Sequence, residues 1–290
     1  ATHQARYPLA HPPAKRATLN NADFIRQLDL HCDDTVKVEK GGEIIPKIVG
    51  IDLEKRKAGS KPVEFITHCP ECGAQLVQKE GEAAWYCPNS MGCPPQIKGR
   101  IEHFISRKAM NIESLGEGKV EMLFDNHLIN NYADLYDLTY DKLYGLEKVE
   151  TYVDETSLFQ ETITRKVSFK EKTVNNILNS LIKSREVPFA RVLYALGIKE
   201  VGETTAKVIA NKMGSIDNLI NASLEELQEI NTVGETIALS IRNFFDDERN
   251  ISIINRLKNA GLQFSQEKKV ATENQLLAGK TIVVSGVFAN

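Results

Sequence analysis

Four cysteines with short spacings carry the clearest chemistry in this sequence. They occur as Cys69-x2-Cys72 and Cys87-x5-Cys93, and all four lie within 25 positions. Thiolates at such spacings can occupy the corners of a tetrahedron around Zn²⁺, and a site closed by four sulfurs leaves no position for a catalytic water. The sequence therefore predicts a structural zinc site, with a redox Cys-x-x-Cys or an iron–sulfur centre as alternatives.

A short hairpin is the element that would bring the two cysteine pairs together. Residues 75–79 and 83–87 suit two strands, and Gly81 suits the turn between them. The fifth cysteine, Cys32, stands alone, and we expect it to be buried as a small apolar residue. An odd number of cysteines, four of them clustered, favours a metal site in a reducing compartment over a disulfide framework.

Glycine turns before short helices form a second recurring feature. Four stretches share it, at 112–124, 143–149, 196–210 and 230–241. The last two contain V-G-E-T-x-A and place their glycines 32 positions apart, which is typical of repeated supersecondary units. After the second copy, residues 150–168 break the pattern and predict an inserted loop or extra hairpin.

Each of these turns could bind a phosphate group. Glycine permits a positive φ and a close backbone approach, and the following helix directs free N–H groups at whatever lies before it. A plain helical hairpin with glycine caps is the alternative for a single copy, whereas several copies match the periodic backbone of a duplex. The residues predicted to contact DNA, by backbone or side chain, are Gly116, Gly118, Gly197, Lys199, Gly202, Thr204, Lys207, Gly234, Thr236, Arg242, Arg16 and Lys108.

Composition limits the remaining possibilities. The 290 residues suffice for about two domains. Lys and Arg number 36 against 39 Asp and Glu, a formal net charge of -3, which differs from the basic signature of many nucleic-acid binders and predicts modest electrostatic attraction. We find no Walker-type loop, dinucleotide fingerprint, nucleophile–base constellation or histidine metal motif, and no apolar run of the roughly eighteen residues needed to span a bilayer.

The two ends of the chain predict different local structure. Residues 21–29 suit a short helix, and the alternating residues on both sides of Gly41-Gly42 suit a hairpin with an edge or a bulge at Pro46. Residues 54–62 predict a linker. Near the other end, residues 281–285 predict a lone strand, which is not stable by itself, so we expect the chain to be cut from a longer one.

These modules, in this order, resemble the C-terminal part of a bacterial NAD-dependent DNA ligase. R-A-T-L-N-N-A-D-F-I at 16–25 and G-G-E-I-I-P-K-I at 41–48 resemble the oligonucleotide-binding (OB) domain of that family. The cysteine spacing matches its zinc finger. I-S-R-K-A-M-N-I-E-S-L-G-E at 105–117 and L-G-I-K-E-V-G-E-T-T-A at 196–206 resemble its helix-hairpin-helix domain, and L-A-G-K-T-I-V-V-S-G at 277–286 is similar to the first strand of its BRCT domain.

The resemblance implies a multi-module α+β chain. It places an OB-fold domain, a partial β-barrel, at 1–62, although residues 1–14 match nothing in the family, and a four-cysteine zinc finger at 63–100. An all-α tandem helix-hairpin-helix domain follows at 101–262, then a linker at 263–275 and the truncated start of a BRCT domain at 276–290.

The same resemblance implies a role in sealing DNA nicks in three nucleotidyl-transfer steps. Adenylate passes from NAD to a lysine and then to the 5′-phosphate of the nick, and the 3′-hydroxyl finally displaces AMP. The adenylation domain with its Lys-x-Asp-Gly nucleophile is absent, so NAD and Mg²⁺ would bind elsewhere and these residues alone should be inactive. They would grip nicked double-stranded DNA, as a monomer in the bacterial cytoplasm. The alternatives are a free-standing DNA-binding adaptor with helix-hairpin-helix and BRCT modules and, less well matched, a fragment of a repair nuclease.

Overall fold

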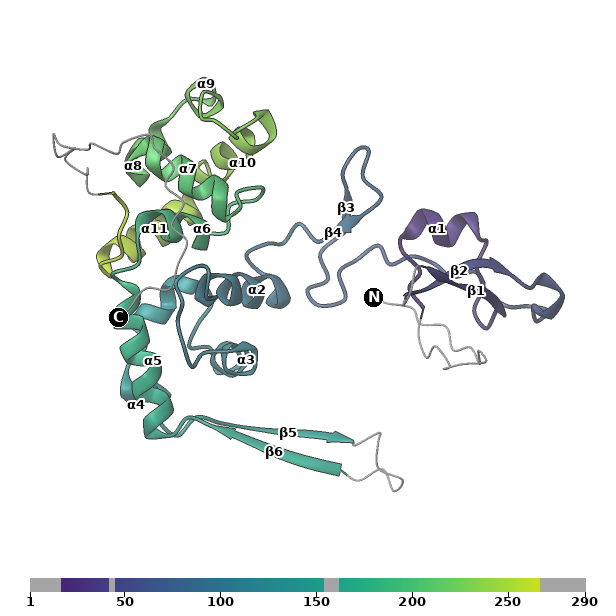
Figure 1. Cartoon of the computed structure of the whole chain (residues 1–290). Helices are drawn as coiled ribbons and strands as arrows, with labels where there is room; N and C mark the ends of the chain where they lie inside the picture. The colour runs from purple at the N-terminus through teal and green to yellow at the C-terminus, as the bar shows by residue number, and fades with distance from the viewer. Residues whose placement is uncertain (1–16, 42–44, 154–161, 267–290) are drawn as a thin grey trace, which may run out of the picture. The chain divides into compact units, whose positions relative to one another are not determined.

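The computed structural model describes residues 17–41, 45–153 and 162–266. The chain forms two compact units, Ala1–Gly99 and Arg100–Asn290, whose elements are labelled in Figure 1. Arg16 and the predicted BRCT strand lie outside the described residues.

The first unit opens with a helix and a hairpin. Helix α1 (Ala22–Gln27) begins after Asn21, whose side chain accepts a hydrogen bond from the backbone N–H of Phe24 at 2.9 Å. Strand β1 (Val36–Gly41) pairs antiparallel with β2 (Ile45–Ile51), which confirms the predicted helix and hairpin. The helix and the two strands share one apolar core with the residues beside them. It is made of Ala17, Ile25, Leu30, Val36 and Ile48.

Of the two alternatives predicted for the strand with Pro46, the structure has the edge strand and no bulge at that residue. Pro46 lies opposite Lys40 in regular register, whereas the register shifts between Lys37, opposite Gly50, and Val38, opposite Ile48. The extra residue is therefore Val49, not Pro46. Only two strands pair in the described part of this sheet, so Pro46 does lie on an edge strand, where its missing N–H breaks no ladder.

The predicted linker at 54–62 is wrong, because this segment is fixed to the hairpin core. A 3₁₀ turn, η1 (Leu53–Lys55), begins it. The Lys61 carbonyl accepts a hydrogen bond from the N–H of Cys32, and the Val63 N–H donates to the Leu30 carbonyl, both at 2.8 Å. Cys32 itself is exposed, so the expectation of a buried thiol is also wrong.

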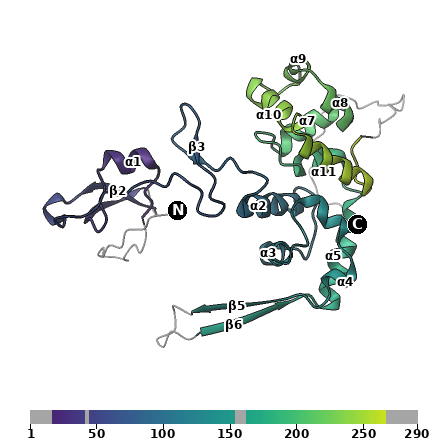
Figure 2. The same ribbon diagram turned by 180° about the vertical axis from the view of Figure 1, so that it is seen from behind.

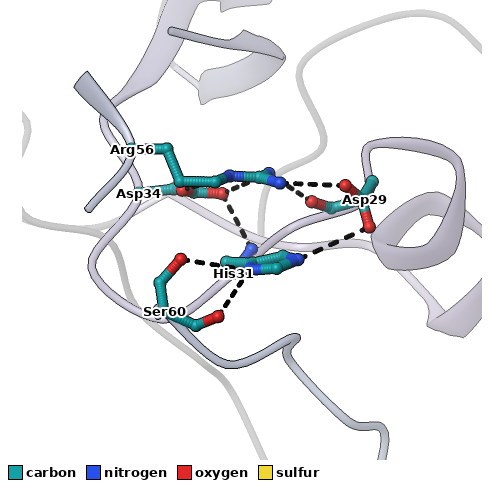
Figure 3. A network of polar contacts seen from close by, with 5 residues as sticks. All are labelled: Asp29, His31, Asp34, Arg56 and Ser60. Atoms are coloured by element: carbon teal, nitrogen blue, oxygen red, sulfur yellow. Dashed lines mark hydrogen bonds and ion pairs between the residues drawn. The ribbon is translucent and has the colours of Figure 1, made fainter. Parts of the chain in front are cut away.

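An ion-pair network holds the same segment in place (Figure 3). Arg56 donates to both carboxylate oxygens of Asp34 at 2.9 Å and to Asp29, and the Asp34 side chain is 1% exposed. Asp34 also accepts the N–H of His31, whose ring contacts the carbonyl and hydroxyl of Ser60. The basic composition of this stretch, with single Gly, Ser and Pro residues, gave no sign that one of its cations pairs with a buried carboxylate.

The second unit is mainly helical, and it includes one β-ribbon. Helix α2 (Pro94–Ile105) leads into it from the first unit. Its further helices are α3 (Glu117–Asp125), η2 (Tyr132–Asp137), α4 (Tyr140–Leu143), α5 (Glu171–Ser184), α6 (Phe189–Ala195), α7 (Glu203–Met213), α8 (Ile216–Asn221), α9 (Leu224–Gln228), α10 (Glu235–Phe245) and α11 (Glu248–Asn259).

Long-range contacts fasten these helices into one body. Phe104 is fully buried and stacks on Tyr132 with ring centroids 4.6 Å apart. Arg256 donates to Asp134 at 2.7 Å, which joins α11 to η2. Phe264 is 8% exposed, so packing continues to the end of the described residues, and the predicted linker at 263–275 begins inside the packed unit.

The insertion in the second repeat is a β-ribbon, as predicted. Strands β5 (Glu147–Val153) and β6 (Thr162–Ser168) pair antiparallel, and the ribbon extends away from α4 and α5 in both views (Figures 1 and 2). At its base the Gly145 N–H donates to the Phe169 carbonyl, and the Phe169 N–H donates to the Leu146 carbonyl. The chain therefore enters and leaves the ribbon at one point of the helical body.

Candidate metal centre and nucleic-acid interface

The four clustered cysteines have the geometry of a closed tetrahedral site. The Sγ atoms of Cys69 and Cys93 are 3.9 Å apart, those of Cys72 and Cys87 are 3.5 Å apart, and all four lie within 4.8 Å of one another. A zinc–sulfur bond of about 2.3 Å gives about 3.8 Å between sulfurs in a tetrahedron. The four thiols therefore form a donor set of the type and size that Zn²⁺ requires.

Two local structures position these thiols. Strands β3 (Val77–Gln78) and β4 (Trp85–Tyr86) form the predicted hairpin, which turns with a positive φ of 78° at Gly81. Before it, the Cys69 carbonyl accepts the N–H of Gly73 at 2.8 Å, and Gly73 has a φ of 70°, so the chain turns tightly around the first cysteine pair.

The thiols differ in how readily they lose a proton. Burial raises the pKa of Cys93 to about 12, and burial also raises the pKa of Cys87. The backbone N–H of Ala74 lowers the pKa of Cys72 to about 7. A metal ion that binds all four as thiolates must therefore displace protons that burial would otherwise retain.

Three helices of the second unit begin in the same way. A residue with positive φ is followed by a buried apolar residue and then by an extended glycine that caps the helix. The three sets are Ser114-Leu115-Gly116 before α3, Glu200-Val201-Gly202 before α7 and Thr232-Val233-Gly234 before α10.

This shared geometry corrects one part of the prediction. The capping glycines do not have positive φ, since Gly202 has a φ of -78° and Gly234 a φ of -83°. The positive values fall two residues earlier, on Glu200 at 65° and Thr232 at 76°. Only Gly197 among the predicted contact glycines has a positive φ, of 70°. The sequence gave no signal for the left-handed residues, because Ser, Glu and Thr are not typical of that region.

The capping glycines instead leave the helix ends open. A Cβ added to Gly116, Gly118, Gly202 or Gly234 would have no neighbour within 4 Å. Gly118, Thr204 and Thr236, in the first helical turns, are exposed residues, and their backbone N–H groups have no acceptor among the residues described. Unpaired N–H groups and the positive end of a helix dipole together favour an anion at each of these ends.

The predicted lysines lie on the surface near these helix ends. Lys108 is 3.3 Å from the carboxylate of Glu203, and Lys199 is 3.9 Å from that of Glu200. Lys207 is exposed on α7. Exposed ion pairs of this kind contribute little to stability, so their lysines can exchange a carboxylate for a phosphate at small cost.

The guanidinium of Arg242, a predicted DNA contact, is bound within the fold. It donates to the carbonyls of Ile220 and Ala222 at 2.6 and 3.1 Å and pairs with Asp246 at 2.8 Å. These bonds satisfy carbonyls at the end of α8, where a helix leaves its acceptors unpaired. Arg242 therefore holds α10 to α8, a structural role that the sequence did not predict.

Three family models match separate parts of the chain. Residues 9–60 match the NAD-dependent DNA ligase OB-fold domain, residues 68–94 the NAD-dependent DNA ligase C4 zinc finger domain, and residues 191–254 the helix-hairpin-helix motif. The predicted multi-module α+β organisation is confirmed, and two of the three models describe domains of NAD-dependent DNA ligases.

Curated relatives extend the likeness over nearly the whole chain. A DNA ligase of Bacteroides fragilis is 50% identical over 277 residues, or 95% of this chain. A DNA ligase of Flavobacterium psychrophilum is 49% identical over 97% of the chain, and one of Porphyromonas gingivalis is 42% identical over 94%. The chain spans 39% of the length of the first two relatives and 38% of the third. It belongs to the NAD-dependent DNA ligase family. Within the described ranges, no helix is long and apolar enough to cross a membrane.

Proposed function

We propose that this chain grips duplex DNA for an enzyme that seals nicks with NAD and Mg²⁺. The observation that carries the proposal is the repeated helix start, with three exposed helix ends of one geometry in a chain that also matches two ligase-specific domains. Backbone amides that bind phosphates hold a duplex without reading its sequence.

In this proposal the chain acts by positioning. The amides of Gly118, Thr204 and Thr236 hold phosphates, and Lys199 and Lys207 add side-chain contacts. The nucleotidyl-transfer chemistry belongs to residues beyond these 290, because the sequence contains no Lys-x-Asp-Gly. Holding the nick termini in line contributes to the rate, since bound reactants no longer lose translational and rotational freedom during reaction.

We also propose that Cys69, Cys72, Cys87 and Cys93 hold one structural zinc ion. When bound, the metal supplies no catalytic chemistry, because four sulfurs close its coordination shell. The residues themselves cross-link the 69–73 turn, the β3–β4 hairpin and the start of α2. We further propose that the full-length protein acts as a monomer in the cytoplasm.

Two measurements on the zinc-loaded full-length protein test the proposal. Fluorescence anisotropy should show binding to nicked duplex with little sequence preference, and the affinity should fall as salt rises. Sealing of a 5′-phosphorylated nick should require NAD and Mg²⁺. Sequence-dependent or salt-independent binding, or sealing that proceeds without NAD, would contradict the proposal.

A further inference from the structure

A polar cavity of about 320 Å³ lies between α5 and the turn after α2. Asn176, Asn179 and Lys183, at helical spacing on α5, form one wall, and Asn111 and Glu113 of the turn form another. The N–H of Glu113 donates to the buried Ser180 hydroxyl on α5 at 2.7 Å. This bond fixes the two walls relative to each other, so the cavity is built into the fold.

The cavity is rich in hydrogen-bond donors that the protein leaves unused. The ammonium of Lys183 and the side-chain amides of Asn111, Asn176 and Asn179 have no protein partner in the described part of the chain. These four side chains are exposed, so water satisfies them in the free protein, and each can turn to an acceptor oxygen of a ligand without losing a bond to the protein.

A fixed arginine adds to the positive charge of this cavity. Arg191 donates through Nε to the Lys108 carbonyl at 3.2 Å and through one Nη to the Arg107 carbonyl. Its other Nη has no partner among the described residues, and Arg191 is one of the residues that line the cavity. The guanidinium is therefore oriented by the turn after α2 before any ligand arrives.

The balance of groups favours an anion with several acceptor oxygens. Two cations, Lys183 and Arg191, face one carboxylate, Glu113. A single carboxylate is too few ligands for a divalent cation, and the polar lining disfavours an apolar molecule. A phosphodiester offers charge and acceptors that amides, an ammonium and a guanidinium all match.

The cavity shares lining residues with a second hollow that reaches one of the proposed phosphate sites. This hollow of about 510 Å³ shares Asn111, Glu113 and Ser114 with the first and extends to Gly116, the cap of α3. This second hollow also carries Arg107 and the carboxylates of Glu102 and Glu117, so of the two hollows only the cavity on α5 has an excess of cations.

We propose that the cavity between α5 and the 110–114 turn binds a backbone phosphate of DNA. The neighbouring phosphate of the same strand lies at the α3 end. The inference rests on the proposed function and deepens it by assigning a contact to α5. Lys183 and Asn179 carry the binding, and Arg191 is the oriented second cation.

Anisotropy titrations of the zinc-loaded full-length protein with nicked duplex, over a series of KCl concentrations, test this site. Lys183→Gln should weaken binding about five-fold and reduce the slope of log affinity against log salt by about 0.9, the value for one phosphate contact. Asn179→Asp should weaken binding about ten-fold through repulsion. The matched controls are Lys142→Gln, on α4, and Asn243→Asp, on α10, which remove or add the same charge away from the cavity.

The outcomes separate this inference from the function on which it rests. If the unmodified (parent) protein binds DNA and both cavity variants have its affinity and salt slope, the α5 site is overturned. The proposed function then stays intact. A parent that binds no duplex would instead overturn the proposed function. If inorganic phosphate at constant ionic strength abolishes the difference between Lys183→Gln and parent, the cavity holds a free anion rather than a strand, and the proposal fails.

Discussion

Gly202 and Gly234 lie 32 positions apart and share one backbone conformation, with φ and ψ of -78° and 175° in the first and -83° and 178° in the second. Each caps a helix of 11 residues and faces open space. The two helix ends are therefore copies of one structure. Because a duplex presents phosphates at regular intervals, such copies suit binding that positions DNA without reading bases.

Gly202→Asp should separate folding from DNA binding. Aspartate is a favourable N-cap residue, and replacing glycine by it should change the free energy of unfolding by only a few tenths of a kcal/mol. The new Cβ would meet no neighbour within 4 Å. The carboxylate would, however, repel a phosphate at the helix end, so the dissociation constant for duplex DNA should rise about ten-fold or more.

Gly202→Asn is the matched control for this change. Asparagine has the same size and caps helices equally well, but it carries no charge. Its effect on the dissociation constant should be clearly smaller. An equal loss in both variants would assign the effect to steric bulk, and an unchanged affinity in Gly202→Asp would show that no phosphate lies at the α7 end.

Zinc content should depend on the clustered thiols and not on the remaining one. Cys72→Ser should lose the metal and unfold the region around it, because metal binding and local folding are one event. Cys32→Ser should retain one zinc ion per chain, since Cys32 is exposed and outside the cluster. Elemental analysis of both purified variants measures this difference.

Zinc affinity should rise with pH. Without metal, burial raises the pKa of Cys93 to about 12 and raises that of Cys87. Zinc must therefore displace protons when it binds. Acid favours the protonated thiols, so zinc is released as the pH falls. Competition with a chromogenic chelator over a pH series measures the dependence, and a pH-independent affinity would exclude coordination by these thiols.

The ion pair between Asp34 and Arg56 should make the first unit sensitive to acid. Burial alone would raise the pKa of Asp34, but the hydrogen bonds from Arg56 and from the His31 N–H outweigh it, and the pKa is lowered from 3.8. A lowered pKa in the folded state contributes stability that is fully present above the unfolded pKa of about 3.9. This stability is lost as pH falls through the folded value.

Asp34→Asn should therefore lower stability at neutral pH and flatten its fall below about pH 4. Fluorescence of Trp85, the one tryptophan of the chain, which packs near Phe65, can follow acid unfolding of this unit. Asp33→Asn is the control, since its side chain is 75% exposed. If both variants unfold along the same pH curve, Asp34 does not carry the acid dependence.

Much of this architecture could be predicted from local sequence. Cysteine spacing indicated the metal cluster because the ligands of a small site are close in sequence. The cap-type Asn21 and the alternating residues on both sides of Gly41 indicated a helix and a hairpin through short-range rules. The β5–β6 ribbon could be anticipated because residues 150–168 interrupt the helical pattern.

The errors share a physical cause, which is dependence on tertiary contacts. Arg56 lies in a stretch with the composition of a linker, yet a buried carboxylate 22 positions away fixes it. The positive φ values of Glu200 and Thr232 do not follow from residue type, since neither residue favours the left-handed region, and each is followed by a buried valine. Cys32 has no sequence feature that reveals its exposure. Patterns within a few residues could not report such contacts.

Arg242 and Lys207 offer a direct test of which cations face DNA. Arg242→Ala removes hydrogen bonds from a charged donor to two backbone carbonyls, so we expect the free energy of unfolding to fall by about 1–2 kcal/mol while DNA affinity is retained. Lys207→Ala removes only an exposed charge on α7. It should leave thermal stability unchanged but reduce the salt slope of DNA binding by about 0.9. Loss of DNA affinity in a fully folded Arg242→Ala protein would restore Arg242 as a contact, and a parent-like slope in Lys207→Ala would place the DNA backbone beyond the reach of that side chain.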